Sequence, residues 1–512
     1  MQQFLFKKEI RNLCVFLTPF TIAFIVIAIF NIYNDNPDCD CFYMARTGQW
    51  IIDNHAIPRM NYFVAHEGYA LTVQQWLFCI ICDVILYNFG VAGAYVWSYT
   101  VYVLMFVMFY IYVHKYIDGK SFSFFVTAFI MVLMSSYCKL RPYTLDMFMM
   151  MGVVMCCDMF VKTHNKKFLI PLPFISFLSI NLHASFWLFM FVFMMPFVVP
   201  HKLGLKALGV KNYIKNWFSE AKWFLLIMCC MIATSFLNPL GLQAMLFFKQ
   251  FHVTDLAGRV GEMKPMTYAH EGVMYVVALL IFALVIALKL KQGKLKDFSV
   301  LYLIIGPVIF ALFANRNAIL LSIPFLYSLQ YVFPKDFAVK HELVNIEIGI
   351  NVVILTVVSI VLVIMMTNPF IGRFHDGLQF NISAIDYLDE HNVDKETTKI
   401  YHWSDAGSYI EFRGYKGWLD SRAEMFYKDT NGVENTYDEF DVTVYADSNE
   451  ADVKAYFDKY DFDYVITPYF EDSTTVRLFL NSDTYREVVT IPDSDILLTL
   501  RIPGYRMFEK IK

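Results

Sequence analysis

The chain has 512 residues, of which 57% are hydrophobic and 18% aromatic, while only 17% are charged. Soluble domains carry about 25% charged residues, so this composition excludes an ordinary soluble protein and requires lipid around much of the chain. The net charge of −4 at pH 7 conceals an uneven distribution: residues 368–512 carry 15 Lys and Arg against 28 Asp and Glu, and the preceding part carries 27 against 18. We therefore expect a membrane part at residues 1–367 and an acidic soluble domain at 368–512, with no nucleic-acid partner.

The first apolar run covers residues 13–33 and follows the basic residues Lys7, Lys8 and Arg11. It is long enough to cross about 30 Å of hydrocarbon and too long for the core of a signal peptide. Basic residues before the run and several Asp residues after it predict a cytoplasmic N-terminus. The next segment, 34–70, is then the first extracytoplasmic loop.

Eleven further apolar runs follow, at residues 71–89, 91–113, 121–137, 143–161, 168–182, 184–200, 223–237, 271–290, 299–313, 318–333 and 346–367. The lysine-rich loops 201–222 and 289–296 are predicted to be cytoplasmic, which places 238–270 and the acidic C-terminal domain outside the cell. A chain that starts inside and ends outside crosses the membrane an odd number of times. We therefore predict about 11 spans from the 12 runs.

One of the twelve runs is then not a full span, and the segment 71–89 is the best suspect. It contains Gln74, Gln75, Asp83 and Asn88, which are costly in lipid unless protein or water covers them.

The C-terminal part has the pattern of a small α/β domain. The predicted elements are helices at Ile382–His391 and Ala451–Lys459, strands at Lys399–Trp403, Gly417–Leu419 and Tyr464–Thr467, and a hairpin from Tyr485 to Arg501. No glycine-rich phosphate loop and no His/Cys cluster with metal-ligand spacing occurs in it.

The first outer loop concentrates polar groups next to a helical pattern. Asp-Asn-Pro-Asp-Cys-Asp at 35–40 precedes residues 41–54, where Phe42, Ala45 and Trp50 fall along one apolar face. Such a helix could rest in the membrane interface and hold Asp38 and Asp40 at the boundary of water and lipid. The alternative is a solvated acidic loop that only fixes the topology.

Several short motifs, in this order, resemble bacterial membrane glycosyltransferases of the GT-C type. They are Asp40-Cys-Phe-Tyr-Met-Ala-Arg-Thr-Gly48, Ile57-Pro58, Asn61-x-Phe63, Gln75-Trp76-Leu77, Arg141-Pro142, Asn181-Leu-His183, Asn238-Pro-x-Gly241, Asn315-Arg316, Ser404-Asp-Ala-Gly-Ser-Tyr409 and Leu419-Asp-Ser-Arg-Ala423. Each motif is weak alone, and the similarity rests on their order along nearly the whole chain.

The resemblance implies a polytopic helical membrane protein with a GT-C-like bundle and a C-terminal extracytoplasmic α/β domain, related in fold to protein O-mannosyltransferases and the lipid A aminoarabinose transferase. It implies a bacterial cell-membrane enzyme that moves a hexosyl or pentosyl group from a polyprenyl-phosphate sugar to a glycan or lipid acceptor. Transfer would invert the anomeric centre and release a lipid phosphate at the outer face. A divalent cation would be compatible with this chemistry, but the residues single out no metal ligand.

The sequence departs from this branch at three positions, with Met44 in place of His, Asn61 in place of Asp and Gln75 in place of Glu. Three acids or bases are therefore absent, which puts activity in doubt, while Asp40 remains. Relatives of this fold use one acid in this loop to activate the acceptor hydroxyl, so Asp40 is the expected general base. Asp38 is a further catalytic candidate.

Other candidates lie near the predicted outer ends of helices. Arg141 and Arg316 would stabilise the leaving phosphate, although either could be only a headgroup anchor. Asp146 is a catalytic candidate that could equally cap its own helix, and His183 could bind substrate or be structural. Weaker substrate-binding candidates are Arg259, Lys264, Asn61 and Gln75.

Two other functions fit the same sequence. A transporter or flippase of lipid-linked saccharides would share the bundle and the outer arginines, but it should show internal repeats with paired broken helices, and no convincing repeat is visible. A non-catalytic envelope scaffold would use the bundle only as an anchor, and the three absent acids favour it slightly.

The predicted topology can be tested by cysteine labelling. A cysteine introduced between Asn368 and Lys512, where the chain has none of its own, should react with a membrane-impermeant maleimide on intact cells. A cysteine introduced between Lys211 and Lys215 should react only after the cells are opened, because lysine-rich loops stay in the cytoplasm. The parent protein supplies the background from native cysteines, and C-terminal labelling only in opened cells would contradict the topology.

Overall fold

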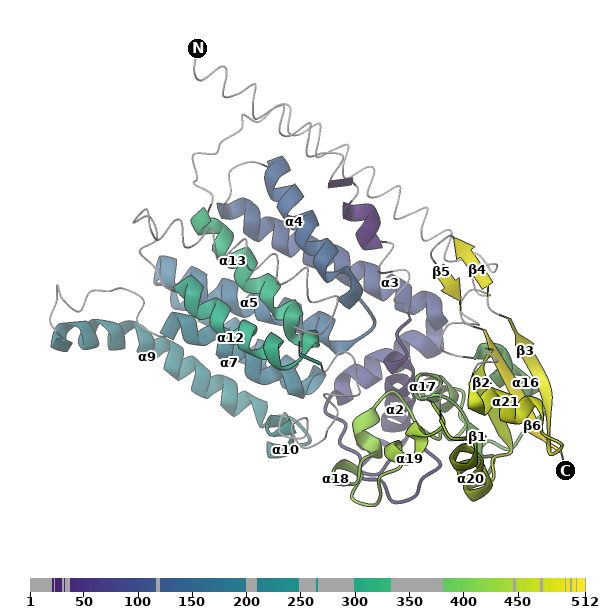
Figure 1. Cartoon of the computed structure of the whole chain (residues 1–512). Helices are drawn as coiled ribbons and strands as arrows, with labels where there is room; N and C mark the ends of the chain where they lie inside the picture. Colours follow the sequence, from purple (N-terminus) through teal and green to yellow (C-terminus); the bar gives the residue numbers. More distant parts are fainter. Residues whose placement is uncertain are drawn as a thin grey trace, which may run out of the picture. The chain divides into compact units, whose positions relative to one another are not determined.

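The computed structural model describes residues 21–22, 24–29, 32, 37–116, 120–198, 210–247, 264–265, 299–332, 381–444, 448–469, 473–492, 494–497, 500–502 and 504–511. The chain divides into two compact units, whose elements are labelled in Figure 1. The first unit comprises Met1–Asn36, Ala94–Phe248 and Asp255–Leu362, and the second comprises Pro37–Gly93, Lys249–Thr254 and Val363–Lys512. Each unit is considered by itself.

The first unit is helical. Its described elements are the C-terminal part of α3 (Trp76–Tyr116), α4 (Lys120–Met134), η1 (Ser135–Tyr137), α5 (Pro142–Thr163), η2 (Lys166–Leu169), α6 (Pro171–Leu182), α7 (Ala184–Val198), α9 (Val210–Ser235), α10 (Leu242–Met245), α12 (Ser299–Phe313), η7 (Asn315–Leu321) and α13 (Ser322–Val332). Helix α7 packs against α5, α6, α9 and α12. Prolines at the first turns of α5 and α6 suit helix starts, where the missing N–H costs nothing.

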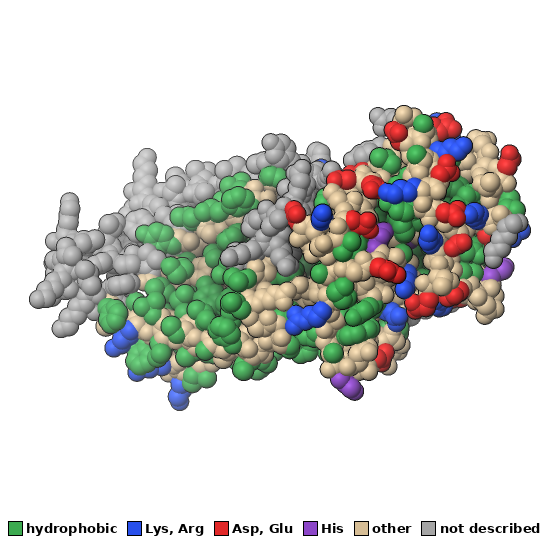
Figure 2. All heavy atoms as spheres, turned by 90° about the horizontal axis from the view of Figure 1, so that it is seen from below, with side chains coloured by type: hydrophobic (Ala, Val, Ile, Leu, Met, Phe, Trp, Pro, Cys, Tyr) green, Lys and Arg blue, Asp and Glu red, His purple; other side chains and the backbone are tan. Residues whose placement is uncertain are grey.

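The surface of these helices is apolar. Val96, Val103, Val107 and Ile111 recur at spacings of four and seven residues along α3, and each is exposed, so one face of this helix is mostly apolar. Figure 2 likewise shows many apolar and few charged side chains over the part of the surface that belongs to these helices. Two described helices, Trp76–Lys115 and Pro142–Thr163, are long and apolar enough to cross a membrane.

Most predicted spans coincide with described helices. The runs 121–137, 143–161, 168–182, 184–200, 223–237, 299–313 and 318–333 correspond to α4, α5, α6, α7, α9, α12 and α13. The runs 271–290 and 346–367 and most of 13–33 lie outside the described residues. The number of crossings and the orientation in the membrane stay predictions.

The predicted runs 71–89 and 91–113 form one helical segment, α3, that is broken at Gly90. Gly90 has φ 59° and ψ −156°, a backbone conformation that only glycine adopts readily. The part before the break belongs to the second unit and the part after it to the first. Asp83 in the earlier part is partly buried and lies beside Gly48.

The second unit combines the segment predicted to be the first outer loop, the start of α3 and the C-terminal α/β part. Its elements are α2 (Asp40–Asn54), α16 (Ile382–Glu390), β1 (Ile400–Tyr401), α17 (Ser404–Phe412), η8 (Ala423–Phe426), α18 (Lys428–Asn431), α19 (Tyr437–Asp441), α20 (Glu450–Tyr460), β2 (Tyr464–Pro468), α21 (Thr474–Leu480), β3 (Tyr485–Ile491), β4 (Ser494–Leu497), β5 (Leu500–Ile502) and β6 (Tyr505–Lys510). Four strands form a mixed sheet of order β1-β2-β6-β3, in which β1 pairs parallel with β2 and the other pairs are antiparallel.

The α/β character, α2, α16, α20, β1 and β2 are confirmed within a residue or two. The predicted strand Gly417–Leu419 is wrong: Gly417 makes only an isolated parallel bridge with Val64 of the outer loop. The predicted hairpin is wrong at its second strand, because β3 pairs with β6 and the segment ending at Arg501 forms a small separate sheet, β4–β5.

The domain boundary predicted at residue 367 stays a prediction. Residues 37–93 belong to the same compact unit as the C-terminal part. The apolar periodicity of α2 therefore serves packing within this unit: Phe42 contacts the rings of Tyr409 and Phe412 in α17, with centroids 5.0 and 5.3 Å away. Whether α2 also touches the membrane interface stays a prediction.

Candidate functional site

Two close contacts between backbones fix helix α2 and helix α17. A Cβ atom at Gly48 of α2 would lie 2.1 Å from the carbonyl oxygen of Cys79 in α3, and one at Gly407 of α17 would lie 1.7 Å from that of Leu419. No side chain fits at these distances, so only glycine allows the contacts. The glycines of the Thr47-Gly48 and Ala406-Gly407 motifs are thus explained by packing.

Asp38, Cys39 and Asp40 form an acidic corner where α2 begins. The carboxylate of Asp38 accepts the backbone N–H of Asp40 at 3.1 Å, and one ligand atom from each of the three residues lies within 4.8 Å of the others. Asp38 is buried and Asp40 is partly exposed. Asp40 stands in the first helical turn, where the positive end of the helix dipole favours a carboxylate.

Asp38 and Asp40 also bear on the question of a cation. Their oxygens are the donors that Mg²⁺ and Mn²⁺ prefer, but they supply fewer atoms than the six that such ions take. The described residues here thus offer only part of a coordination shell.

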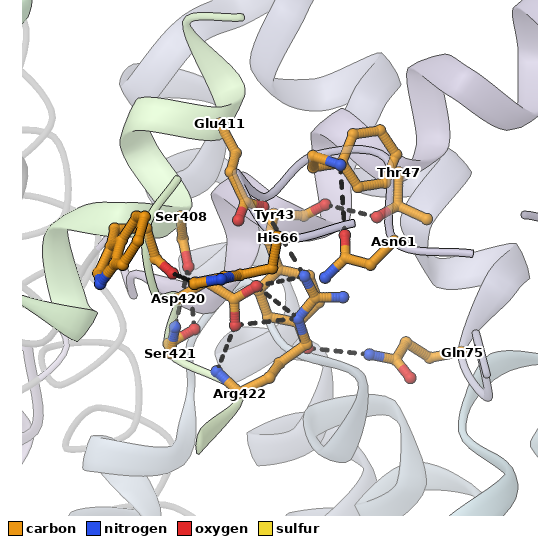
Figure 3. A network of polar contacts seen from close by, with 12 residues as sticks. Tyr43, Thr47, Asn61, His66, Gln75, Ser408, Glu411, Asp420, Ser421 and Arg422 are labelled. Atoms are coloured by element: carbon orange, nitrogen blue, oxygen red, sulfur yellow. Dashed lines mark hydrogen bonds and ion pairs between the residues drawn. The ribbon is translucent and has the colours of Figure 1, made fainter. Parts of the chain in front are cut away.

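Tyr43, one turn further along α2, is the centre of a buried polar network (Figure 3). The guanidinium carbon of Arg422 lies 4.3 Å from the centroid of its ring, and Gln75 donates a hydrogen bond from Nε2 to its hydroxyl at 3.0 Å. Burial raises the pKa of Tyr43 well above its ordinary value, and the negative charge of Asp40 adds to the rise. Tyr43 is therefore a neutral phenol.

Arg422 is buried and paired with two acids. Its guanidinium forms a fork with Asp420, with Nε 3.1 Å from each carboxylate oxygen, and its Nη2 lies 3.7 Å from Glu411. Burial alone would lower the pKa of Arg422, but the two acids raise it above its usual range. Burial, followed by the nearby Asp420, raises the pKa of Glu411 well above its ordinary value.

Two histidines, His66 and His402, bind the backbone of Trp418, which lies four residues before Arg422. His402 accepts the backbone N–H of Trp418 at Nε2, 2.8 Å away, and contacts the carbonyl of Trp403 through Nδ1 at 2.9 Å. His66 of the outer loop contacts the carbonyl of Trp418 through Nε2 at 2.8 Å. Because one ring nitrogen of His402 must accept, the ring is neutral, and burial lowers its pKa to about 4.

The three positions that depart from the resembled branch are buried in this unit. Met44 is 1% exposed, Asn61 4% and Gln75 8%. Gln75 contacts Tyr43, and Asn61 accepts the backbone N–H of Phe63 at 3.3 Å through Oδ1. The Nδ2 of Asn61 has no hydrogen-bond partner among the residues that the structure describes. Of the predicted substrate-binding residues, Asn61 and Gln75 thus share a unit with Asp38 and Asp40.

The remaining predicted residues lie in the first unit. Asp146 of α5 is fully buried and binds His183, which lies between α6 and α7, so it does not cap its own helix. Arg141 precedes α5 and lies 5.7 Å from the ring centroid of Tyr143. Arg316 in η7 and Lys264 are partly buried, and Arg259 lies outside the described residues.

Two of the motifs in the first unit also contact one another. Asn238 donates hydrogen bonds from Nδ2 to the carbonyl of Ile180 at 2.8 Å and to the side chain of Asn181 at 3.2 Å. The Asn181-Leu-His183 and Asn238-Pro-x-Gly241 motifs therefore stabilise the same bend of the chain.

Sequence reasoning underrated Asp420 and Arg422 and missed Tyr43, Glu411 and His66. Asp420 and Arg422 were visible in the sequence as members of the Leu419-Asp-Ser-Arg-Ala423 motif. Nothing in the sequence pairs Arg422 with Tyr43, since the contact joins opposite ends of the chain.

Comparison with known proteins defines the fold. The chain is similar to the crystal structure of the Archaeoglobus fulgidus oligosaccharyltransferase in its apo form, with 13% identity and a TM-score of 0.50 over 88% of this chain and 69% of that chain. It is similar as well to the archaeal oligosaccharyltransferase AglB from Archaeoglobus fulgidus in complex with an inhibitory peptide and a dolichol-phosphate, with 12% identity, a TM-score of 0.51 and the same coverage. No protein-family model and no curated protein matches the sequence.

These similarities show that the chain has the fold of these oligosaccharyltransferases, which is of the GT-C type. The expected GT-C fold is confirmed. The bacterial branch of it stays a prediction, because at 12–13% identity the likeness concerns the fold alone.

The buried ion pair yields a stability prediction. Arg422→Ala leaves Asp420 buried without its cation and should lower the free energy of unfolding by about 3–5 kcal/mol. Arg422→Lys keeps the charge but loses the planar fork, so its free energy of unfolding should lie between those of the wild type and Arg422→Ala. Thermal unfolding of the full chain in detergent measures both variants.

The matched control is Arg486→Ala, whose guanidinium pairs with Glu509 at 2.6 Å with a side chain 65% exposed. Exposed pairs contribute at most about 1 kcal/mol, so this variant should stay near the wild type. Equal losses of stability in the Arg422→Ala and Arg486→Ala proteins would contradict a special role for the buried ion pair.

His402 yields a prediction of pH dependence. Its pKa is about 4 in the folded protein and about 6.5 in an unfolded chain. Between these values the unfolded state binds more protons, so stability falls as the pH is lowered, by roughly 3 kcal/mol over the whole window. Thermal midpoints between pH 7 and 4.5 should show this slope, and His402→Asn should flatten it.

The exposed His391 provides the control for this slope. The His391→Asn protein should keep the pH slope of the wild type. An unchanged slope in the His402→Asn protein would assign the pH dependence to other groups.

Proposed function

We propose that the chain is a membrane glycosyltransferase that moves a sugar from a polyprenyl-phosphate donor to an acceptor of the cell envelope at the outer membrane face. The observation that carries the proposal is the GT-C fold, which covers 88% of the chain. A second observation supports it, because AglB of this fold was solved with a dolichol-phosphate, a lipid phosphate of the class that the donor would release.

Asp40 is the general base of the proposed reaction. The acceptor oxygen attacks the anomeric carbon while its proton passes to Asp40, the bond from that carbon to the phosphate oxygen breaks, and polyprenyl phosphate leaves. The attack inverts the anomeric configuration. The partial exposure of Asp40 at the start of α2 supports this role, because a base must reach its proton within hydrogen-bond distance.

The buried network around Tyr43 positions this acid. Arg422, Asp420 and Gln75 hold Tyr43 within α2, and Asp40 lies one helical turn before it. A base that is held rigidly loses less entropy when the reaction begins. In this proposal Arg422 is a positioning residue, and Arg141 and Arg316 are the cations assigned to the leaving phosphate.

An experiment with purified protein separates the proposal from its alternatives. The protein is incubated in vesicles with a panel of labelled polyprenyl-phosphate hexoses and pentoses, and transfer or hydrolysis of the sugar is followed. A flippase would move the donor across the vesicle membrane unchanged. A scaffold would neither move the donor nor change it. Intact donor throughout the panel, with a correctly folded protein, would overturn the enzymatic proposal.

Asp40→Asn should slow transfer by about 10²-fold or more, because it keeps the shape and removes the proton acceptor. Donor binding should change little. Arg316→Ala should weaken donor binding as well as transfer, since a fixed cation stabilises the bound phosphate and the leaving phosphate alike. Rates at saturating donor and dissociation constants for the lipid-linked sugar measure the contrast.

Asp53→Asn is the control for Asp40→Asn, because Asp53 is an exposed carboxylate on the same helix. It should transfer at the wild-type rate. Near-normal transfer by the Asp40→Asn protein would move the proposed base to Asp38.

A further inference from the structure

Asp146, His183 and Ser185 form a chain of polar contacts within the helical unit. The Asp146 carboxylate contacts Nδ1 of His183, and Nε2 of the same ring lies 2.9 Å from the hydroxyl oxygen of Ser185. The acid comes from α5, the histidine from the break between α6 and α7, and the serine from the first turn of α7. These residue types in this order are the arrangement by which a histidine activates a serine.

The hydrogen bonds define the state of the imidazole. A carboxylate only accepts, so Nδ1 carries the proton and donates it to Asp146. In the neutral ring Nε2 is then the acceptor and faces the Ser185 hydroxyl. Phe186 stacks on the imidazole with centroids 4.7 Å apart and an interplanar angle of 20°, which holds the ring in this orientation.

Asp146 is committed to this histidine. Its side chain is 0% exposed, and its Oδ1 has no hydrogen-bond partner in the part of the chain that the structure describes. A buried carboxylate is costly unless it faces a positive charge. Asp146 would therefore stabilise the imidazolium that forms when His183 takes a proton.

We propose that Ser185 is a nucleophilic serine, activated by His183 and Asp146, which accepts an acyl group from an ester carried on an apolar chain. Ser185 is partly exposed, whereas His183 and Asp146 are buried, so the reacting oxygen is the accessible member. The apolar chain fits because Leu188 and Phe189, one turn after Ser185 on α7, are apolar and partly exposed. This activity is separate from the proposed sugar transfer.

The step balances without a further reagent. The Ser185 oxygen bonds to the ester carbonyl carbon while its proton passes to Nε2 of His183. The tetrahedral intermediate then collapses, the bond to the ester oxygen breaks, and His183 returns the proton to the departing alcohol. The positive end of the α7 dipole lies at Ser185 and favours the transient oxyanion. Water or an acceptor hydroxyl releases the acyl group by the same steps.

An alkyl fluorophosphonate tests the proposal on the full-length protein in detergent, because it reacts only with activated serines and needs no knowledge of the substrate. Mass spectrometry should locate the adduct on Ser185, and Ser185→Ala should abolish it. His183→Gln and Asp146→Asn should slow labelling by about 10²-fold or more, the scale on which losing the base or its orienting acid acts.

Ser179→Ala is the matched control, because Ser179 is a buried serine of the neighbouring helix α6. It should be labelled at the wild-type rate. Circular dichroism and gel filtration of every variant separate lost reactivity from lost fold. Absence of an adduct on folded wild-type protein, or full-rate labelling of the His183→Gln protein, would overturn the proposal and leave a structural contact among three helices.

Discussion

The buried guanidinium of Arg422 is the constraint on which the second unit depends. A charge removed from water costs several kcal/mol unless partners surround it, and here the partners come from both ends of the chain: Asp420 beside it, Glu411 of α17 and the ring of Tyr43 from α2. If any of these partners moved away, the guanidinium would be exposed to water or left buried without a partner. The position of α2, and of the acids where it begins, therefore follows from the C-terminal sequence.

Two glycines make that arrangement sterically possible. Gly48 brings α2 against the backbone of α3, and Gly407 brings α17 against the backbone at Leu419. The loop then pairs along its backbone with the C-terminal part, where Gly417 donates its N–H to Phe63 and Ala65 donates to Gly417, at 3.0 and 2.8 Å. The outer loop is thus an integral part of the α/β unit, and part of its motif resemblance reflects packing.

Features set by neighbouring residues could be predicted from the sequence, whereas contacts between residues far apart in the sequence could not. Apolar runs report burial residue by residue, so most bundle helices and α2 were predictable. The strand expected at Gly417–Leu419 does not form, because Trp418 packs against the ring of Phe462. Gly417 pairs instead with Val64 of a distant loop. The contacts of Arg422 with Tyr43 and of Asp146 with His183 join separate elements, and no local pattern encodes such pairs.

The buried neutral residues bear on the meaning of the absent acids. The network already holds two carboxyl groups against one guanidinium, and burial, followed by the nearby Asp420, raises the pKa of Glu411 well above its ordinary value. A Glu at position 75 would add a third carboxyl group within hydrogen-bond distance of Tyr43, where it would have to be neutral or unpaired. Gln75 instead donates a hydrogen bond and adds no charge. The replacement is thus accounted for by the charge balance of the network, whether or not the position once served chemistry. An ionised acid is stable where water and a helix N-terminus meet it, and within this unit Asp40 occupies such a place.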